Sequence, residues 1–257
     1  MLWTTTDYDR VRVLTANRPD ALNAMNGALV SGLIEVLTDA AKDDSVRVTV
    51  LTGSGKAFSA GADLDLLSQP DTEENRRMLS ETIPAMFDLL VDYPKPLLMA
   101  VNGLGVGFGA TVLGLADLVI MAESARIMVP FSTLSVVPEA CSSYSFPQRI
   151  GYQKAFWFLL SGEWMSAEEC VAAGLALEAV PSRELMEKAL EKAQTLARFP
   201  THTLIESKRL MRMPHREQLL AANRAEIDRL VDLLHHPACK EGIAAIREQR
   251  QPDYGAY

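Results

Sequence analysis

Short apolar runs rich in β-branched residues alternate with longer helical patterns through the first half of the chain. The runs cover residues 11–15, 47–52, 97–101, 118–121 and 125–129. The helical patterns between them cover about residues 25–41, 73–92 and 107–116. Helices of roughly 10–20 residues between strands are typical of right-handed βαβ units, in which the strands run parallel. The sequence therefore predicts an α/β fold built on a parallel sheet.

The second half of the chain has a different pattern. After about residue 150 no further strand is expected, and helices are predicted over residues 151–161, 166–173, 182–198, 201–212 and 215–235. Ser166, followed by Ala-Glu-Glu, begins one of them in the manner of a capping box, and Gly174 is suited to end it. An apolar stripe over residues 220–234 fits either the core of the chain or a contact between subunits, and its spacing is compatible with both.

Charge and composition exclude several classes of partner. The net charge of −8 over 257 residues leaves no basic surface for nucleic acid or for an anionic membrane. No apolar run reaches the roughly 20 residues that a membrane span needs, and neither end carries a targeting signal, so we expect a cytoplasmic protein. The cysteines and histidines lack the spacing of a disulfide framework or of a metal site, so no metal is expected.

Two glycine-rich segments, residues 52–64 and 102–111, each follow a predicted strand. Neither has the spacing of a dinucleotide-binding or Walker A loop, and the chain contains no GxSxG nucleophile elbow. Glycine lets a ligand approach the backbone closely and leaves N–H groups accessible. Two such loops facing each other can direct two N–H donors at one oxygen, as in an oxyanion hole. Each segment alone is explained more simply as a tight turn.

Several segments together carry a resemblance to a known family. They are Asn17–Ala24 (NRPDALNA), Ala57–Leu64 (AFSAGADL), Pro94–Pro96 (PKP), Val101–Gly103 with the glycines that follow to Gly109, Ala116–Leu118 (ADL) and Gly162–Gly174. In this order the chain resembles the crotonase superfamily, also called the enoyl-CoA hydratase/isomerase family, over about residues 10–180. The resemblance implies a spiral of ββα units over residues 1–195. It also implies a helical region over 196–257 that assembles the protein as a homotrimer or a dimer of trimers.

The resemblance also implies the binding site of an acyl-CoA thioester, in which coenzyme A is part of the substrate and no separate cofactor is needed. The thioester oxygen would lie between the backbone N–H groups of Ala62 and Phe108. The Phe108 position is often glycine in the family, so its ring is expected to shape the acyl pocket, and the helix at 73–92 is expected to border that pocket. The residues expected to line the substrate are Ala60, Gly61, Ala62, Asp63, Leu64, Gly107 and Phe131, with Ala21 and Leu22 near the pantetheine or adenine. Asp63 is also expected to cap the next helix, and Asp117 to lie at a turn or strand edge.

The type of reaction depends on which carboxyl groups are present. Hydratases of the family use two glutamates, but Thr111 and Phe131 occupy those positions here, and neither side chain acts as a base near neutral pH. The segment Pro138-Glu139-Ala140-Cys141-Ser142-Ser143 resembles the PEGCSS motif of the peroxisomal-type Δ3,Δ2-enoyl-CoA isomerases. Their glutamate is the catalytic base. The resemblance therefore implies that Glu139 moves a proton from C2 to C4 through a dienolate, with its pKa raised by apolar neighbours.

Two alternatives to the isomerase remain open. One is another enolate reaction on the same scaffold, either hydration or a hydrolase-like reaction. The other is a coenzyme A-binding module without catalysis, similar to chromatin-associated relatives that have lost the base or broken the glycine loops. This chain keeps Glu139 and the glycines at 103, 105, 107 and 109, which favours an enzyme of acyl-CoA and lipid metabolism. The length and branching of the acyl chain are not specified.

Overall fold

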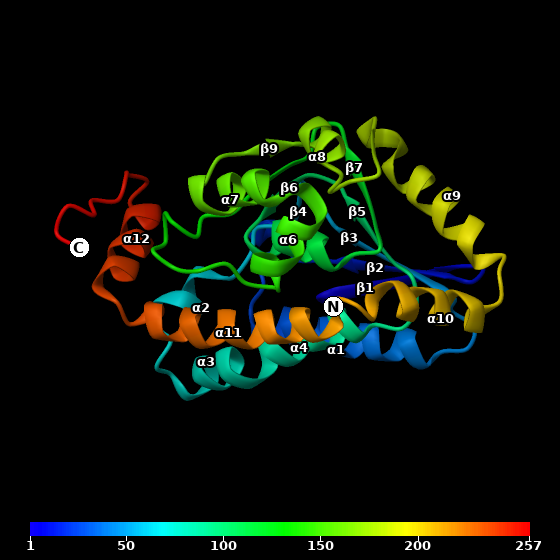
Figure 1. Ribbon diagram of the computed structural model, residues 1–257, viewed down its shortest axis with the longest axis horizontal. Coiled ribbons are helices and arrows are strands. Elements are labelled where there is room, and N and C mark those ends of the chain that lie inside the picture. Colours follow the sequence, from blue (N-terminus) through cyan, green and yellow to red (C-terminus); the bar gives the residue numbers. More distant parts are fainter.

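A computed structural model describes all of residues 1–257 (Figure 1). It contains two sheets surrounded by helices. The larger sheet has the strand order β1-β2-β3-β5-β7-β10, and the smaller has the order β4-β6-β8-β9. The strands are β1 (Trp3–Tyr8), β2 (Val11–Ala16), β3 (Val48–Gly53), β4 (Ala57–Ser59), β5 (Leu97–Val101), β6 (Leu104–Val106), β7 (Leu118–Ala122), β8 (Arg126–Met128), β9 (Met165–Ser166) and β10 (Glu178–Val180). The predicted α/β class is confirmed.

The chain winds as a spiral, because successive pairs of strands add one strand to each sheet. The pairs β3 and β4, β5 and β6, and β7 and β8 each place their first strand in the larger sheet and their second in the smaller. The strands from β2 to β10 pair in parallel in the larger sheet, and only the edge strand β1 is antiparallel to its neighbour. Strands β3, β5 and β7 are almost wholly buried, as expected for a parallel sheet covered on both faces.

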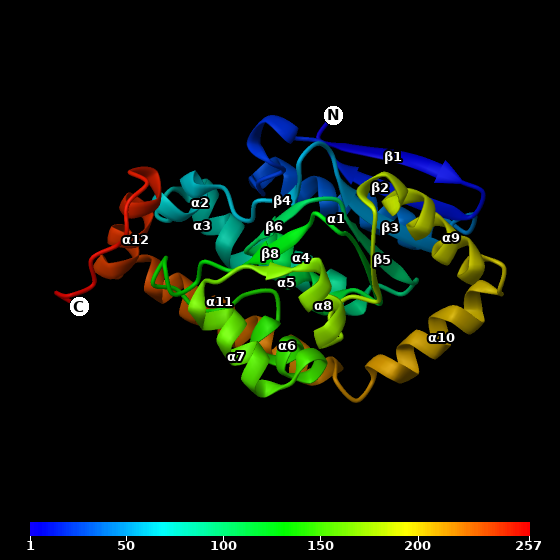
Figure 2. The ribbon, with the colours of Figure 1, turned by 90° about the horizontal axis from the view of Figure 1, so that it is seen from above.

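The helices cover the outer faces of this spiral. They are α1 (Gly27–Lys42), α2 (Leu64–Ser68), α3 (Glu73–Arg77), α4 (Ile83–Asp92), α5 (Phe108–Thr111), α6 (Ser142–Ile150), α7 (Tyr152–Ser161), α8 (Ala167–Ala173), α9 (Leu185–Ala197), α10 (Thr201–Arg212), α11 (Arg216–Leu234) and α12 (Pro237–Arg247). Helix α11 runs beside α4, and α2, α3 and α12 gather at one end of the molecule (Figures 1 and 2). No helix is long and apolar enough to cross a membrane.

The structure corrects the predicted elements at several positions. Strands β9 and β10 lie beyond residue 150, where none was expected, because segments of two and three residues are too short to show a period. The helix expected over 107–116 is the single turn of α5 followed by a 3-10 turn, Val112–Leu115. The pattern over 73–92 is a continuous helical run, but a π-helical turn at Met78–Thr82 interrupts it between α3 and α4.

Several predicted local features are confirmed. Ser166 and Glu169 form a reciprocal capping box, and Gly174 ends α8 in the left-handed conformation at φ 84°. Asp63 caps α2 by accepting a hydrogen bond from the Asp65 N–H. Most of the stripe on α11 is buried within the single chain, since Leu220, Ile227, Leu230 and Leu234 are each at most 8% exposed. Val231, its remaining member, is partly buried and packs against the same core. This result selects the core interpretation of that stripe.

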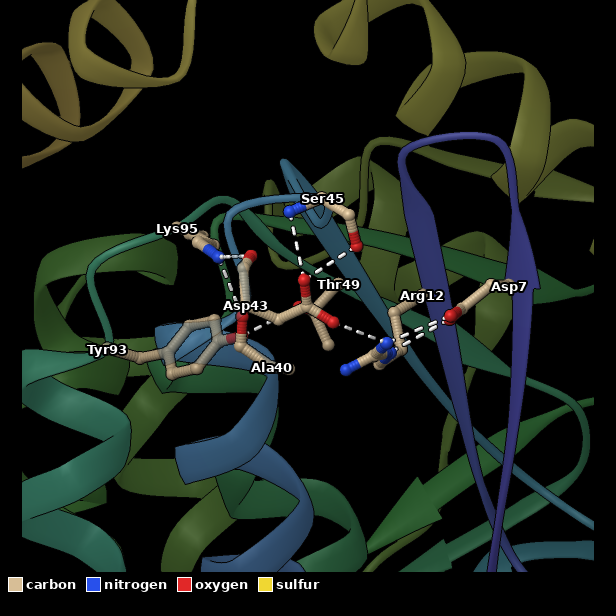
Figure 3. Close-up of polar contacts among 8 residues, drawn as sticks. All are labelled: Asp7, Arg12, Ala40, Asp43, Ser45, Thr49, Tyr93 and Lys95. Carbon is tan, nitrogen blue, oxygen red and sulfur yellow. Dashed lines mark hydrogen bonds and ion pairs between the residues drawn. The ribbon is translucent and has the colours of Figure 1, made fainter.

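Two buried cations tie helices to the sheet. Lys95 donates from Nζ to the Ala40 and Asp43 carbonyls, both at 2.7 Å, and so satisfies the C-terminal end of α1 (Figure 3). Asp117, at the edge of β7 as expected, forms ion pairs with Lys208 at 2.6 Å and Arg212 at 3.2 Å on α10. The ion pairs of Asp117 were not predicted. They fix the start of the C-terminal helices against the core.

Candidate active site

A cavity of about 690 Å³ lies between the two glycine-rich loops and the helices at the end of the molecule that includes α2 and α12. Twenty-two of its 29 lining residues are hydrophobic, and its size is typical of a small-molecule site. The charged residues in its lining are Arg18, Asp63 and Glu139. Arg18 and Asp63 form an ion pair at 2.8 Å, so Glu139 is the one carboxyl group in the lining without a cationic partner.

The structure brings together almost all of the residues expected at the site. Those that line the cavity are Ala21, Ala60, Gly61, Ala62, Asp63, Leu64, Gly107, Phe108, Phe131 and Glu139. Leu22 does not line it and is 39% exposed. The Leu22 carbonyl instead accepts a hydrogen bond from the Ala60 N–H at 2.9 Å, which fixes the start of the first loop. The Phe108 ring stacks on Phe87 of α4 and forms part of the apolar wall.

The two glycine-rich loops are in backbone contact. Strands β4 and β6 pair in parallel, so the loops that follow them leave the same edge of the smaller sheet. Gly61 has φ 83°, and a Cβ there would lie 2.7 Å from the Val106 carbonyl oxygen. Gly107 has φ 52°, and a Cβ there would lie 3.7 Å from the Gly61 Cα. Glycine at position 61 is therefore required for the loops to approach this closely.

Each loop presents a backbone N–H that has no acceptor within the protein. Met25 donates to the Gly61 carbonyl and accepts from the Asp63 N–H, so the intervening Ala62 N–H faces the opposite side of the extended segment. Phe108 is the first residue of α5, where an N–H has no partner within the helix. No hydrogen bond to a protein acceptor is formed by either amide. Both donors are therefore available to a ligand.

Glu139 lies in the loop between β8 and α6. The Thr111 hydroxyl is 2.5 Å from its Oε1 and donates a hydrogen bond to it. Burial raises the pKa of Glu139 to about 8; the Thr111 hydrogen bond opposes this shift and the nearby charge of Glu226 adds to it. A carboxyl group with such a pKa can accept a proton and return it near neutral pH.

The loop after Glu139 turns through two residues with left-handed backbone. Ala140 and Cys141 have φ values of 57° and 58°, and both are fully buried. Ser142 donates from its N–H at 3.1 Å and from its hydroxyl at 2.6 Å to the Glu139 carbonyl. Burial raises the pKa of the Cys141 thiol, which agrees with a packed residue and not with a nucleophile.

Glu226 is a buried residue beside the site that local sequence patterns do not single out. It is 5% exposed on α11, and its two carboxylate oxygens accept hydrogen bonds from the Cys141 N–H at 2.7 Å and the Ser143 N–H at 2.8 Å. Cys141 offers no side-chain cap to α6, so Glu226 caps that helix from a distant part of the chain. The sequence offers one sign of this buried position: Glu226 falls on the same face of α11 as the buried apolar stripe.

Comparisons with known proteins agree with this geometry. Residues 6–256 match the family described as enoyl-CoA hydratase/isomerase. The chain is 36% identical to 2,3-dehydroadipyl-CoA hydratase of Escherichia coli (strain K12), over 95% of each chain. It is also 36% identical to enoyl-CoA delta isomerase 2 of Rattus norvegicus, over 83% of this chain but only 55% of that relative's length.

Solved structures give the same result for the fold. The crystal structure of an enoyl-CoA hydratase/isomerase from Pseudoalteromonas atlantica T6c superposes with a TM-score of 0.90 at 31% identity, covering 99% of this chain and 100% of the other. OdaA of Pseudomonas aeruginosa superposes with a TM-score of 0.88 at 33% identity, covering 95% and 98%.

Proposed function

Because this chain belongs to the enoyl-CoA hydratase/isomerase family, whose members act on acyl-CoA thioesters, we propose that it is a Δ3,Δ2-enoyl-CoA isomerase. The observation that supports this proposal most directly is the single carboxyl group without a cationic partner, Glu139, in an apolar cavity beside two unpaired N–H groups. A double-bond shift needs one group that removes a proton and returns it, together with donors for the enolate oxygen.

In the proposed reaction the ionised Glu139 removes a proton from C2 of a 3-enoyl-CoA. The electron pair of the broken C–H bond forms a dienolate, whose charge is carried by the thioester oxygen. The Ala62 and Phe108 N–H groups donate to that oxygen, and one such donor is typically worth about 3–4 kcal/mol in the transition state. Glu139 then returns the proton to C4, and the double bond lies between C2 and C3. No water is consumed.

Hydration is the second candidate, because one relative at 36% identity over 95% of each chain is named as a hydratase. Adding water requires a group to activate the water as well as a group to protonate carbon. Besides Glu139, the cavity lining contains only the Asp63 carboxylate, which is paired with Arg18 and caps α2. The shortage of a second free acid–base group favours isomerisation over hydration.

The cavity also favours an acyl chain without a second charge. The hydratase relative is named for 2,3-dehydroadipyl-CoA, an acyl group that ends in a carboxylate. Here Arg18 is the one cation in the lining, and it is held by Asp63 and by the Ala24 carbonyl at 2.9 Å. A terminal carboxylate would lose its hydration without gaining a partner, which costs several kcal/mol or more. We therefore propose an uncharged aliphatic 3-enoyl-CoA as the substrate.

A direct comparison of three thioesters tests the proposal. The purified protein is incubated with 3-hexenoyl-CoA, 2-hexenoyl-CoA or 2,3-dehydroadipyl-CoA, and products are separated by liquid chromatography. We expect rapid formation of 2-hexenoyl-CoA from the first thioester, slow hydration of the second and slower hydration of the third. Hydration of either 2-enoyl thioester at a higher kcat/KM than isomerisation would contradict the isomerase assignment.

We also propose that the protein assembles as a homotrimer or a dimer of trimers. Large apolar side chains are exposed on two helices of the single chain, among them Trp157 of α7 at 60% and Met211 of α10 at 73%. Exposed apolar groups of this size favour burial in a contact between subunits. Light scattering coupled to size-exclusion chromatography measures the assembly, and a monomer at micromolar concentration would contradict it.

A further inference from the structure

We infer that the Thr111 hydroxyl couples the protonation state of Glu139 to the strength of the Phe108 N–H as a hydrogen-bond donor. The inference rests on the proposed enolate chemistry and adds a positioning residue to it. Thr111 is fully buried and is absent from the cavity lining. It therefore acts through its neighbours and not by contact with the substrate.

The Thr111 hydroxyl lies within hydrogen-bond distance of two acceptors. Its Oγ1 is 2.5 Å from Glu139 Oε1 and 3.1 Å from the Gly107 carbonyl oxygen. A hydroxyl group has a single hydrogen, so it donates fully to only one of them at a time, and its lone pairs accept from other donors. The charge on Glu139 decides which acceptor is favoured, because an ionised carboxylate is the stronger one.

The Gly107 carbonyl and the Phe108 N–H belong to the same peptide group. That carbonyl already accepts hydrogen bonds from the Ala110 N–H at 2.8 Å and the Thr111 N–H at 2.9 Å. A further donor to the oxygen polarises the peptide and makes its N–H a stronger donor, as hydrogen bonds in a chain reinforce each other. The orientation of the Thr111 O–H bond therefore changes the donor strength of the Phe108 N–H through a single peptide group.

The Thr111 hydroxyl donates to Glu139 in the first half of the reaction and to the Gly107 carbonyl in the second half. Before proton removal Glu139 is ionised, and the hydroxyl of Thr111 donates to it. After proton removal Glu139 is neutral and holds the substrate proton on the carboxyl oxygen that faces the substrate. Its Oε1 is then a weaker acceptor, so the Thr111 hydrogen turns to the Gly107 carbonyl. The Phe108 N–H is then strengthened while the dienolate carries its charge. The proton stays on Glu139 until it returns to C4, and Thr111 keeps its own hydrogen throughout.

Other groups near Glu139 do not replace Thr111 in this role. Glu226, on α11, accepts from two backbone N–H groups and has no proton to donate when ionised. Cys141, in the same loop as Glu139, has a thiol whose pKa is raised by burial, and no bond joins it to Glu139. Thr111 is the one side chain that donates a hydrogen bond to the Glu139 carboxyl group.

Four variants separate coupling from simple packing. Thr111→Val keeps the shape of the side chain and removes the hydroxyl, and Thr111→Ser keeps the hydroxyl. Thr49→Val is the matched control, because Thr49 is also fully buried and bonds Tyr93 at 2.7 Å, in the network of Figure 3. Thr111→Ala repeats the deletion if valine disturbs the packing, and thermal unfolding verifies that each variant is folded.

The main readout is the enolate fraction of bound acetoacetyl-CoA, whose enolate absorbs in the near ultraviolet and which needs no turnover. We expect Thr111→Val to lower that fraction, and to lower kcat for 3-hexenoyl-CoA by roughly tenfold while KM changes little. Thr111→Ser should recover most of both, and Thr49→Val should match the wild type. A wild-type enolate fraction in Thr111→Val and Thr111→Ala would overturn the coupling alone. Absence of any enolate in the wild-type complex would overturn the proposed chemistry, and the coupling with it.

Discussion

Glu226 binds the backbone of the loop that carries Glu139, and of these two carboxyl groups only Glu139 lines the cavity. Glu226 accepts hydrogen bonds from the backbone of Cys141 and Ser143, two and four residues after Glu139. The position of the proposed base therefore depends on a carboxylate that never meets the substrate.

Replacing Glu226 by glutamine leaves one of the two N–H donors facing an NH₂ group. We expect Glu226→Gln to lower the unfolding free energy by about 1–3 kcal/mol, since a buried donor loses its partner. Displacement of Glu139 should lower kcat by on the order of 10- to 100-fold. Urea unfolding and steady-state kinetics measure the two effects. Asp228→Asn is the control, because Asp228 is exposed on the same helix. Unchanged kcat in Glu226→Gln would show that the loop holds its shape without Glu226.

The pH dependence of kcat/KM follows from the raised pKa of Glu139. The base must be ionised to remove a proton, and its pKa in the folded protein is about 8. Activity should therefore rise with pH and level off above pH 8, where the carboxyl group is ionised. Initial rates with a 3-enoyl-CoA between pH 6 and 9 test this. A plateau that is already reached at pH 6 would mean that the cavity leaves the pKa of Glu139 near its ordinary value.

The same raised pKa makes Glu139 costly for the fold. Because its folded pKa lies above the unfolded value of 4.5, the contribution of Glu139 to the unfolding free energy is most favourable below pH 4.5 and becomes less favourable as the pH rises towards 8. Glutamine has no charge and avoids this loss. We expect Glu139→Gln to abolish isomerisation and to be more stable than the wild type by on the order of 1–3 kcal/mol at pH 8. Urea unfolding should give a smaller difference at pH 5. Equal differences at both values would refute the electrostatic origin.

Ala140 occupies the left-handed region at φ 57°, next to the proposed base. Replacing it with glycine removes about 1–2 kcal/mol of backbone strain. The change also loses about 0.8 kcal/mol of methyl burial and adds chain entropy of about 0.5–1 kcal/mol to the unfolded state. We expect Ala140→Gly to change the unfolding free energy by less than about 1 kcal/mol, with activity retained. Ala140→Val should be strongly destabilised, because β-branched residues rarely adopt this conformation. Thermal unfolding of both variants compares them.

The contact between the two loops depends on Gly61. An alanine Cβ there would lie 2.7 Å from the Val106 carbonyl oxygen, which is backbone and cannot rotate away. We expect Gly61→Ala to separate the two N–H donors and to lower kcat/KM by roughly 100-fold. Gly151→Ala is the matched control, because Gly151 has a similar φ of 79° but nothing within 4 Å of a Cβ. Equal losses in both variants would attribute the effect to backbone strain alone.

The sequence predicted the long elements and most of the site because both depend on local patterns. Strand β5 was expected over its observed range, since five consecutive apolar residues between turn signals indicate a buried strand. Strands β4 and β6 were not expected, because three residues that pair across the spiral carry no period of their own. Their pairing is nevertheless what brings Gly61 and Gly107 into contact.

The contacts that set the properties of the site could not be read from local patterns. Glu226 lies 85 residues from Cys141, and the distance of 2.5 Å between Thr111 and Glu139 joins residues 28 positions apart. From the sequence alone, Thr111 is recognisable only as a residue that replaces a glutamate. Such pairs are decided by how the spiral and the C-terminal helices pack, which depends on the whole chain.

The cavity draws its walls from both ends of the chain, from Arg18 and Ala21 at the start to Ile246 of α12 near the end. An acyl chain bound there would contact both the first and the last helical segments, and so would link them through the ligand. Ligand binding should therefore protect α12 from proteolysis, even though that helix carries no acid–base group of the site. Full occupancy of the cavity would therefore require that α12 is folded against the rest of the chain.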